Sequence, residues 1–140
     1  MKPIAAAKLV PIQLYPLYGC KINAGFPSPA DDYIETRLDL NEYLVKHKEA
    51  TFFLRVKGDS MAGANIHDGS LLIVDRAAEP KHKDIVVAVV SGELTVKRLY
   101  KRRGVVKLLA ENEAYPEILI KPENELIVWG VVQHVVHSFG

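Results

Sequence analysis

Short apolar segments follow one another after residue 50, and they constrain the fold more than any other feature of the sequence. Each is rich in Val, Ile, Leu and Phe, the composition of a β-strand. We predict strands over residues 51–56, 70–74, 85–90, 93–99, 105–109 and 125–136. Ser91-Gly92 joins two of them as a two-residue hairpin turn. Such spacing is typical of a single, mostly β domain with a curled or barrel-like sheet.

One short helix is predicted before the first of these strands. Asp39 can cap its N-terminus, and Glu42 follows three residues later, as in a capping box. The residues at helical spacing on one face are Leu40, Tyr43, Leu44 and His47.

The first 24 residues differ in charge and composition from the rest of the chain. They carry three lysines and no acidic residue, a charge of +3, whereas residues 25–140 carry −2. Pro3, Pro11, Pro16 and Gly19 interrupt any regular element there. We therefore expect residues 1–24 to form a flexible, extended arm and residues 25–140 to form the β-rich domain. Two prolines at positions 27 and 29 should keep the backbone extended where the two meet.

Composition excludes several classes of protein. With 140 residues and 49% apolar side chains, the chain can bury a core without disulfides or metals. Cys20 is the single cysteine, so neither a disulfide framework nor a cysteine zinc cluster can form. A net charge of +1 argues against a dedicated DNA-binding protein. No apolar run is long enough for a transmembrane helix or a signal peptide, so we expect a cytoplasmic protein without a membrane partner.

Common catalytic and binding motifs are absent from the sequence. The five histidines do not have the HExxH spacing of a metal site, and the glycines do not follow a phosphate-loop pattern. The basic run over residues 97–103 could bind phosphate, but the solvated end of a hairpin is the more economical interpretation. We therefore expect neither a metal nor a cofactor.

Two polar features remain, and each has an ordinary structural explanation. In Gly58-Asp59-Ser60-Met61, the glycine allows a sharp turn that presents Ser60 after a strand, with backbone N–H groups free to form an oxyanion hole. Taken alone, this is a common polar turn. Lys97 lies within the strand predicted over residues 93–99, on the same face as Thr95 and Leu99. Taken alone, it is an edge lysine that faces water.

Together these features resemble the LexA/UmuD family of self-cleaving serine peptidases. The matching motifs are Gly58-Asp59-Ser60-Met61, Asp68-Gly69-Ser70-Leu71-Leu72-Ile73-Val74-Asp75 and Gly92-Glu93-Leu94-Thr95-Val96-Lys97-Arg98-Leu99. The stretch from Ala24-Gly25-Phe26-Pro27 to Tyr33 resembles the cleavage region of the UmuD branch, and residues 130–136 its closing strand. The similarity extends from about Tyr15 to Val136. One departure is Ala24, where the UmuD type has cysteine and LexA-like repressors have alanine.

The resemblance implies a fold, a site and a reaction. The fold is the LexA/UmuD C-terminal β domain, with Ser60 as nucleophile and Lys97 as general base. The cut falls between Ala24 and Gly25, and the backbone N–H groups of Asp59 and Ser60 stabilise the oxyanion. Because a lysine ordinarily titrates near about 10.4, burial must lower its pKa before it can accept a proton. Candidate apolar neighbours for that burial are Leu99, Val96 and Val56.

The resemblance also implies partners. In the UmuD branch the protein is a homodimer, a RecA filament on single-stranded DNA stimulates cleavage, and the trimmed dimer joins a UmuC-like Y-family polymerase in error-prone translesion synthesis during the SOS response. We expect no direct sequence-specific binding to DNA, because the 24 residues before Gly25 cannot build a helix-turn-helix domain. Two alternatives stay open: a non-enzymatic β interaction module with a mobile arm, and a truncated LexA-like repressor fragment.

Overall fold

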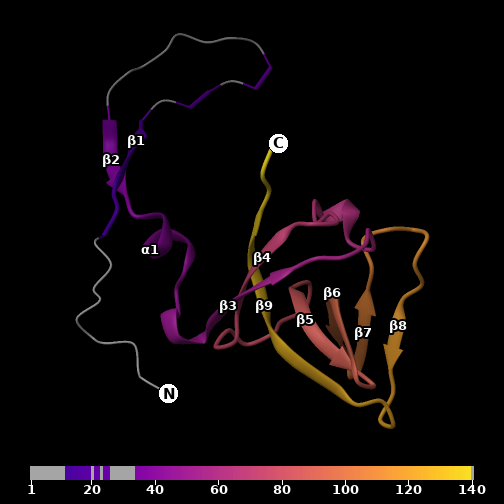
Figure 1. The fold of residues 1–140 in the computed structure, drawn as a ribbon. Coiled ribbons are helices and arrows are strands. Elements are labelled where there is room, and N and C mark those ends of the chain that lie inside the picture. The colour runs from indigo at the N-terminus through magenta and orange to yellow at the C-terminus, as the bar shows by residue number, and fades with distance from the viewer. Residues whose placement is uncertain (1–11, 20, 23, 26–33, 140) are drawn as a thin grey trace, which may run out of the picture. The chain divides into compact units, whose positions relative to one another are not determined.

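The computed structural model describes residues 12–19, 21–22, 24–25 and 34–139 (Figure 1). The chain divides into two compact units, Met1–Tyr43 and Leu44–Gly140, and each is described by itself. The predicted extended backbone at Pro27 and Pro29 lies outside the described residues, as does Cys20.

The first unit contains a two-stranded antiparallel sheet that the sequence did not predict. Strand β1 (Tyr15–Tyr18) pairs with β2 (Ile34–Leu38), and the register shifts between Leu17 and Tyr18. Pro16 lies within β1. Because proline has no N–H to donate, it suits a strand of a two-stranded sheet, which is paired along one edge.

The predicted helix begins where expected and ends early. Helix α1 (Leu40–Leu44) follows Asp39, whose Oδ1 accepts a hydrogen bond from the Asn41 N–H at 3.0 Å. The prediction that His47 shares its face is wrong, because the helix ends three residues earlier. His47 instead precedes the 3₁₀ turn η1 (Lys48–Ala50), and its Nδ1 lies 2.5 Å from Oδ2 of the buried Asp75.

The second unit is built on one seven-stranded sheet in which all neighbouring strands are antiparallel. Its strand order is β3-β4-β9-β5-β6-β7-β8. The strands are β3 (Thr51–Arg55), β4 (Leu71–Asp75), β5 (Ile85–Val90), β6 (Glu93–Arg102), β7 (Val105–Leu109), β8 (Ile118–Ile120) and β9 (Leu126–Val136). A second 3₁₀ turn, η2 (Ala62–Ala64), lies between β3 and β4.

The long strand β9 connects the two halves of this sheet. Its residues 126–131 pair with β5 and its residues 131–136 pair with β4, with an irregularity in each ladder, as can be followed along the yellow strand in Figure 1. At the crossover, Gly130 approaches β4 so closely that a Cβ atom would lie 2.7 Å from Val74 Cγ1 and 2.9 Å from the Asp75 carbonyl oxygen. A residue without a side chain is therefore required there.

Two apolar clusters form the core, and adjacent residues of β5 belong to different clusters. Val86 belongs to one and Val87 to the other, as alternation along a strand requires for opposite faces of a sheet. The first cluster consists of Val56, Met61, Ile66, Leu72, Val74 and Val87. The second consists of Val86, Ala88, Leu99, Leu108 and Val131. A mostly β domain with a curled sheet, as predicted, is confirmed.

The apolar segments in the sequence correspond closely to the observed strands. β5 and β7 have the predicted bounds, β3, β4 and β9 differ by one residue at their ends, and β6 continues three residues further, to Arg102. The Ser91-Gly92 turn is confirmed, with positive φ angles of 48° and 85° at its two residues. β8 was not predicted. Across the described part of the chain, no helix is long and apolar enough to cross a membrane.

Candidate active site

Ser60 lies on the connection between β3 and β4, and we call residues 57–68 of this connection the serine loop. Gly58, the second residue of the loop, has a conformation that suits glycine, with a φ of 95°, and its N–H donates to Oδ1 of Asp68 at 2.8 Å. Beyond the loop, the Val56 N–H donates to the Ser70 carbonyl at 2.9 Å and continues the ladder between β3 and β4. The serine loop therefore leaves and re-enters the sheet at a fixed position.

Two buried side chains anchor the serine loop to the core. Met61 is 1% exposed and Ile66 is fully buried, and both belong to the same cluster as Val56. Ser60, directly before Met61, is half-buried. The loop thus presents the hydroxyl group of Ser60 at the edge of the core, where a peptide can still approach it.

Lys97 lies on β6, and it is one of the two buried residues of that strand, with Leu99. Its side chain is 9% exposed, which is unusual for lysine. Its Nζ lies 2.9 Å from Ser60 Oγ, 3.0 Å from Thr95 Oγ1 and 3.1 Å from the Val96 carbonyl oxygen. The structure therefore brings together the two side chains that the sequence analysis paired, although 37 residues separate them.

The environment of Lys97 favours the neutral amine. Burial lowers the pKa of Lys97 below its ordinary value of 10.5, because removal from water disfavours the ammonium form. A neutral amine has two N–H groups and one lone pair. If it donates to the Val96 carbonyl and to Thr95 Oγ1, its lone pair is left for the Ser60 hydroxyl proton. This is the arrangement that a general base requires.

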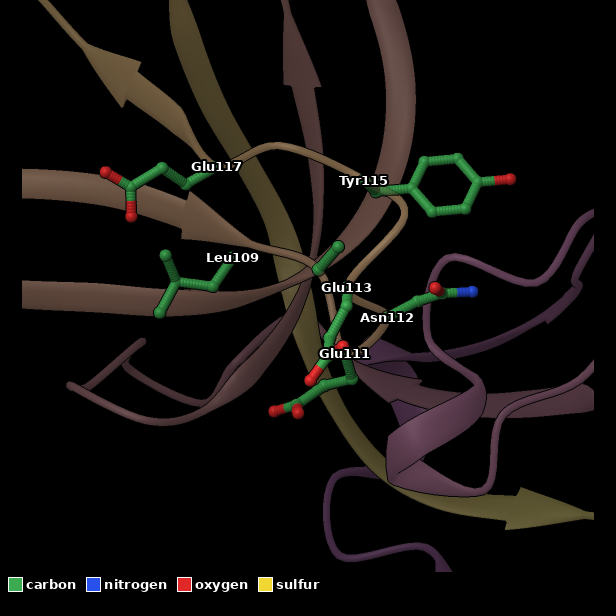
Figure 2. Close-up of a pocket in the computed structure, with 7 residues that line it drawn as sticks. Leu109, Glu111, Asn112, Glu113, Tyr115 and Glu117 are labelled. Carbon is green, nitrogen blue, oxygen red and sulfur yellow. The ribbon is translucent and has the colours of Figure 1, made fainter.

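The segment that follows β7 holds the serine loop in place, and we call residues 111–115 the bracing segment. The Glu111 N–H donates to the Ser60 carbonyl at 2.8 Å, and the Gly63 N–H donates to the Glu111 carbonyl at 2.7 Å. Asn112 Nδ2 donates to the Asp59 carbonyl at 3.0 Å, and the Tyr115 hydroxyl donates to Asp59 Oδ1 at 2.7 Å. In Figure 2 the side chains of Asn112 and Tyr115 point to the same side of this segment.

The bracing segment is also tied to the strand that carries Lys97. The guanidinium Nε of Arg98, the next residue of β6, pairs with Oε1 of Glu111. Glu111, Glu113 and Glu117 line a pocket of about 510 Å³, together with Asn112 and Tyr115 (Figure 2). One short segment therefore contacts the serine loop and β6 together.

Close contact between the serine loop and the bracing segment depends on Gly63. A Cβ atom at this position would lie 2.7 Å from the Glu111 carbonyl oxygen, closer than real Cβ contacts. Because that oxygen belongs to the backbone, it cannot move aside as a flexible side chain could. Gly63 therefore allows the serine loop to approach the bracing segment.

The backbone N–H groups predicted for the oxyanion hole are available for that role. Among the hydrogen bonds between described residues, neither the Asp59 N–H nor the Ser60 N–H has a protein acceptor. Ala24 and Gly25, the residues of the predicted cut, belong to the first unit and are exposed.

Three histidines outside this site have structural partners. His137 Nε2 lies 3.3 Å from the buried Ser70 Oγ, and its ring lies 5.3 Å from that of His67. His82 accepts a hydrogen bond from the Lys101 N–H at 3.1 Å. Where the structure describes the chain, no three His, Cys, Asp or Glu side chains are grouped so that they could hold a metal.

Sequence reasoning did not find the bracing segment. Asn112 and Tyr115 contact Asp59, from which they are separated by 53 and 56 positions in the sequence. No local sequence pattern marks such distant pairs. Only the short turn within it, where the Ala114 N–H donates to Asn112 Oδ1 at 2.9 Å, has a local sequence signal, since asparagine favours such turns.

Comparison with known proteins identifies the family to which the chain belongs. The Peptidase S24-like family matches residues 16–133. The chain is 47% identical over 123 residues to the protein ImpA of Salmonella typhimurium, covering 87% of this chain and 83% of ImpA. It is 48% identical over 120 residues to MucA of Escherichia coli, covering 85% and 82% of the two chains. It is 45% identical over 136 residues to SamA of Salmonella typhimurium, covering 96% and 94%.

The family match covers most of the chain, including both the serine loop and β6, and the alignments with ImpA and SamA are longer still, at 123 and 136 residues. The chain therefore belongs to the Peptidase S24-like family, and within it to the UmuD-like self-cleaving serine peptidases of SOS mutagenesis.

Proposed function

We propose that the chain cleaves itself between Ala24 and Gly25 with Ser60 as nucleophile and Lys97 as general base. The observation that carries this proposal is the distance of 2.9 Å between Lys97 Nζ and Ser60 Oγ, at a lysine that is 9% exposed. A hydroxyl group is a weak nucleophile until a base takes its proton, and a buried lysine in hydrogen-bond contact supplies that base.

The reaction proceeds in two stages. Lys97 Nζ takes the hydroxyl proton as Ser60 Oγ bonds to the carbonyl carbon of Ala24, and the N–H groups of Asp59 and Ser60 donate to the resulting oxyanion. Collapse of this intermediate breaks the bond to Gly25, whose nitrogen receives the proton from Lys97. Lys97 then takes a proton from a water molecule as the water oxygen bonds to the ester carbon. The bond to Ser60 Oγ breaks, this oxygen regains the proton from Lys97, and residues 1–24 are released.

The residues on either side of the cut suit this mechanism. Ala24 requires only a small pocket, and Gly25 lets the backbone approach Ser60 without a side-chain clash. Because the arm is tethered to the domain, its effective concentration at the site would be high. We infer that the arm is rarely in the cleavable position and that a RecA filament on single-stranded DNA favours that position.

The partners follow from the UmuD-like relationship. We propose that the protein acts in the cytoplasm as a homodimer. We further propose that the trimmed form, residues 25–140, is a subunit of a translesion polymerase with a UmuC-like Y-family enzyme. Sedimentation of the purified protein tests the dimer. Capture on immobilised residues 25–140, with full-length Ser60→Ala as the comparison, tests for a polymerase of that family.

Mass spectrometry of the purified protein tests self-cleavage directly. The wild type should yield a fragment that begins at Gly25, slowly on its own at alkaline pH and faster with RecA filament. Ser60→Ala and Lys97→Ala should remain intact. Lys101→Ala, an exposed lysine on the same strand, and Ser138→Ala, an exposed serine, are matched controls that should cleave normally. Intact wild type in the presence of filament, or cleavage of Ser60→Ala, would overturn the proposal.

A further inference from the structure

We propose that Asn112 is a positioning residue for self-cleavage: it fixes the peptide between Asp59 and Ser60, so that the Ser60 N–H is held ready for the oxyanion. This inference rests on the function proposed above, in which that N–H is one of the two oxyanion donors. Asn112 itself touches neither the substrate nor the reacting atoms.

The orientation of the Asn112 amide follows from its two hydrogen bonds. The Ala114 N–H can bond only to an acceptor, so the side-chain oxygen of Asn112 must face it, at 2.9 Å. The side-chain nitrogen then faces the Asp59 carbonyl, at 3.0 Å. The amide is thus fixed within its own turn, and its N–H is directed at the serine loop (Figure 2).

The Asp59 carbonyl and the Ser60 N–H belong to the same peptide group. Because a trans peptide is planar, its C=O and N–H point in opposite directions, and a bond that fixes one fixes the other. The Ala62 N–H also donates to the Asp59 carbonyl, at 3.1 Å. Two donors on this oxygen polarise the peptide and make the Ser60 N–H a stronger donor.

The peptide group that follows Ser60 is also hydrogen-bonded to the bracing segment. The Glu111 N–H donates to the Ser60 carbonyl at 2.8 Å. The peptides before and after Ser60 therefore both bond to the bracing segment, whereas the Lys97 amine bonds to Ser60 Oγ. The Lys97 amine bonds to Ser60, Thr95 and Val96 and to no residue of the bracing segment, so Asn112 can be changed without removing a neighbour of the base.

The fold does not depend on the Asn112 side chain. Asn112 is half-buried, and Met61 and Ile66 anchor the serine loop to the core independently of it. Loss of the bond from Asn112 to Asp59 should leave the loop attached and the Asp59 carbonyl with one donor, the Ala62 N–H, so that the peptide before Ser60 is held less firmly. The effect should therefore appear in the rate of cleavage rather than in stability.

Asn112→Asp separates the two contacts of this side chain. The carboxylate still accepts from the Ala114 N–H but cannot donate to the Asp59 carbonyl. We expect alkaline self-cleavage to slow by about tenfold to hundredfold, approaching the loss caused by removal of one oxyanion donor. The midpoint of the pH–rate profile and the thermal unfolding midpoint should both match those of the wild type. If Asn112→Asp does not fold, Asn112→Ser, whose hydroxyl is too short to reach Asp59, takes its place.

A second variant controls for the added negative charge. Glu113 is exposed, and Glu113→Gln removes one charge from the same segment. Glu113→Gln alone should cleave as the wild type does, and the double variant Asn112→Asp/Glu113→Gln should remain slow. Recovery of the wild-type rate in the double variant would overturn the proposal, because charge would then be the cause.

The remaining outcomes distinguish this inference from the proposed function. Wild-type cleavage by Asn112→Asp, or a slow rate accompanied by a shifted pH midpoint or a lowered unfolding midpoint, would overturn the role of Asn112 alone. Wild type and Ser60→Ala are measured in parallel. Failure of the wild type to cleave, or cleavage by Ser60→Ala, would instead overturn the dyad on which the inference rests.

Discussion

Ser60 and Lys97, the proposed catalytic dyad, are held in different ways. Lys97 lies on β6 within the seven-stranded sheet, where the ladders to β5 and β7 fix its backbone. Ser60 lies on a loop, which two apolar anchors and four hydrogen bonds to the bracing segment hold in place. The sheet therefore fixes the position of Lys97, whereas the position of Ser60 depends on the apolar anchors and polar contacts of its loop.

This difference predicts two kinds of variant. Changes around Lys97 act on groups that the folded sheet buries, so they should alter stability and its pH dependence together with activity. Changes around Ser60 act on half-exposed contacts, so they should alter activity with little change in stability. Loops positioned on a rigid scaffold commonly carry functional groups in this way.

The largest effect is expected for Lys97→Met, which removes the base and fills its place with an apolar side chain. Self-cleavage should disappear. Because the pKa of Lys97 is lowered in the folded state, the unfolded chain binds more protons between that lowered pKa and 10.5, and wild-type stability rises with pH across this window. The stability of Lys97→Met relative to the wild type should therefore decline as pH rises towards 10.5, as measured by urea unfolding. A constant difference would contradict the burial of the amine.

Gly63→Ala should show the second largest effect, on activity. The new Cβ atom would meet the Glu111 carbonyl oxygen at 2.7 Å and push the serine loop away from the bracing segment. A displacement on this scale should slow self-cleavage by about 10²-fold. The loop keeps its apolar anchors, so the thermal midpoint should change little. A normal rate would show that the loop tolerates the shift.

Gly130→Ala is the matched substitution in the sheet. Its Cβ atom would collide with Val74 and with the Asp75 backbone, at the crossover of β9 and β4. We expect a loss of about 1–3 kcal/mol in the free energy of unfolding, the usual cost of overpacking a core. Molecules that remain folded should cleave at nearly the normal rate. If Gly63→Ala lowered stability and Gly130→Ala lowered only activity, the proposed difference between the serine loop and the sheet would be contradicted.

The smallest effect is expected for Tyr115→Phe, which removes one exposed hydrogen bond to Asp59 and keeps the ring. Cleavage should slow by about twofold to tenfold. The hydrogen bond to Asp59 and the charge of its carboxylate raise the pKa of Tyr115 above 10.0, so the wild-type bond should persist through the alkaline range used for the assay. The ratio of the two rates should therefore stay constant up to about pH 10. A ratio that falls earlier would contradict the raised pKa of Tyr115, and equal rates at every pH would show that the bond does not support the loop.

Much of the sheet could be predicted because its strands are continuous apolar runs. β8 was missed because it has only three residues and lies between Pro116 and Pro122. β1 and β2 were missed because β1 is short and contains Pro16, whereas β2 has three consecutive polar residues, Glu35 to Arg37, so neither carries an alternating pattern. Strand prediction from a single sequence depends on such patterns, which tertiary pairing does not need.

The site could be predicted only in part. The resemblance of the serine motif and the lysine strand to a known family indicated Ser60 and Lys97, and the structure brings them into contact. The contacts of Asn112 and Tyr115 with Asp59 are purely tertiary, since they depend on how the connection after β7 returns to the serine loop. Likewise, the reason for a glycine at position 63 becomes visible only beside the Glu111 backbone.

The pairing of β1 with β2 has a consequence for the products of cleavage. A cut between Ala24 and Gly25 falls between these two strands, so β1 leaves with the released peptide while β2 stays with the domain. Before the cut, the chain links the two strands covalently, whereas after it they belong to separate molecules. A pairing of only four residues does not persist between separate molecules at low concentration. The retained chain would then expose the backbone donors and acceptors of residues 34–38, a newly uncovered edge that only the processed form possesses.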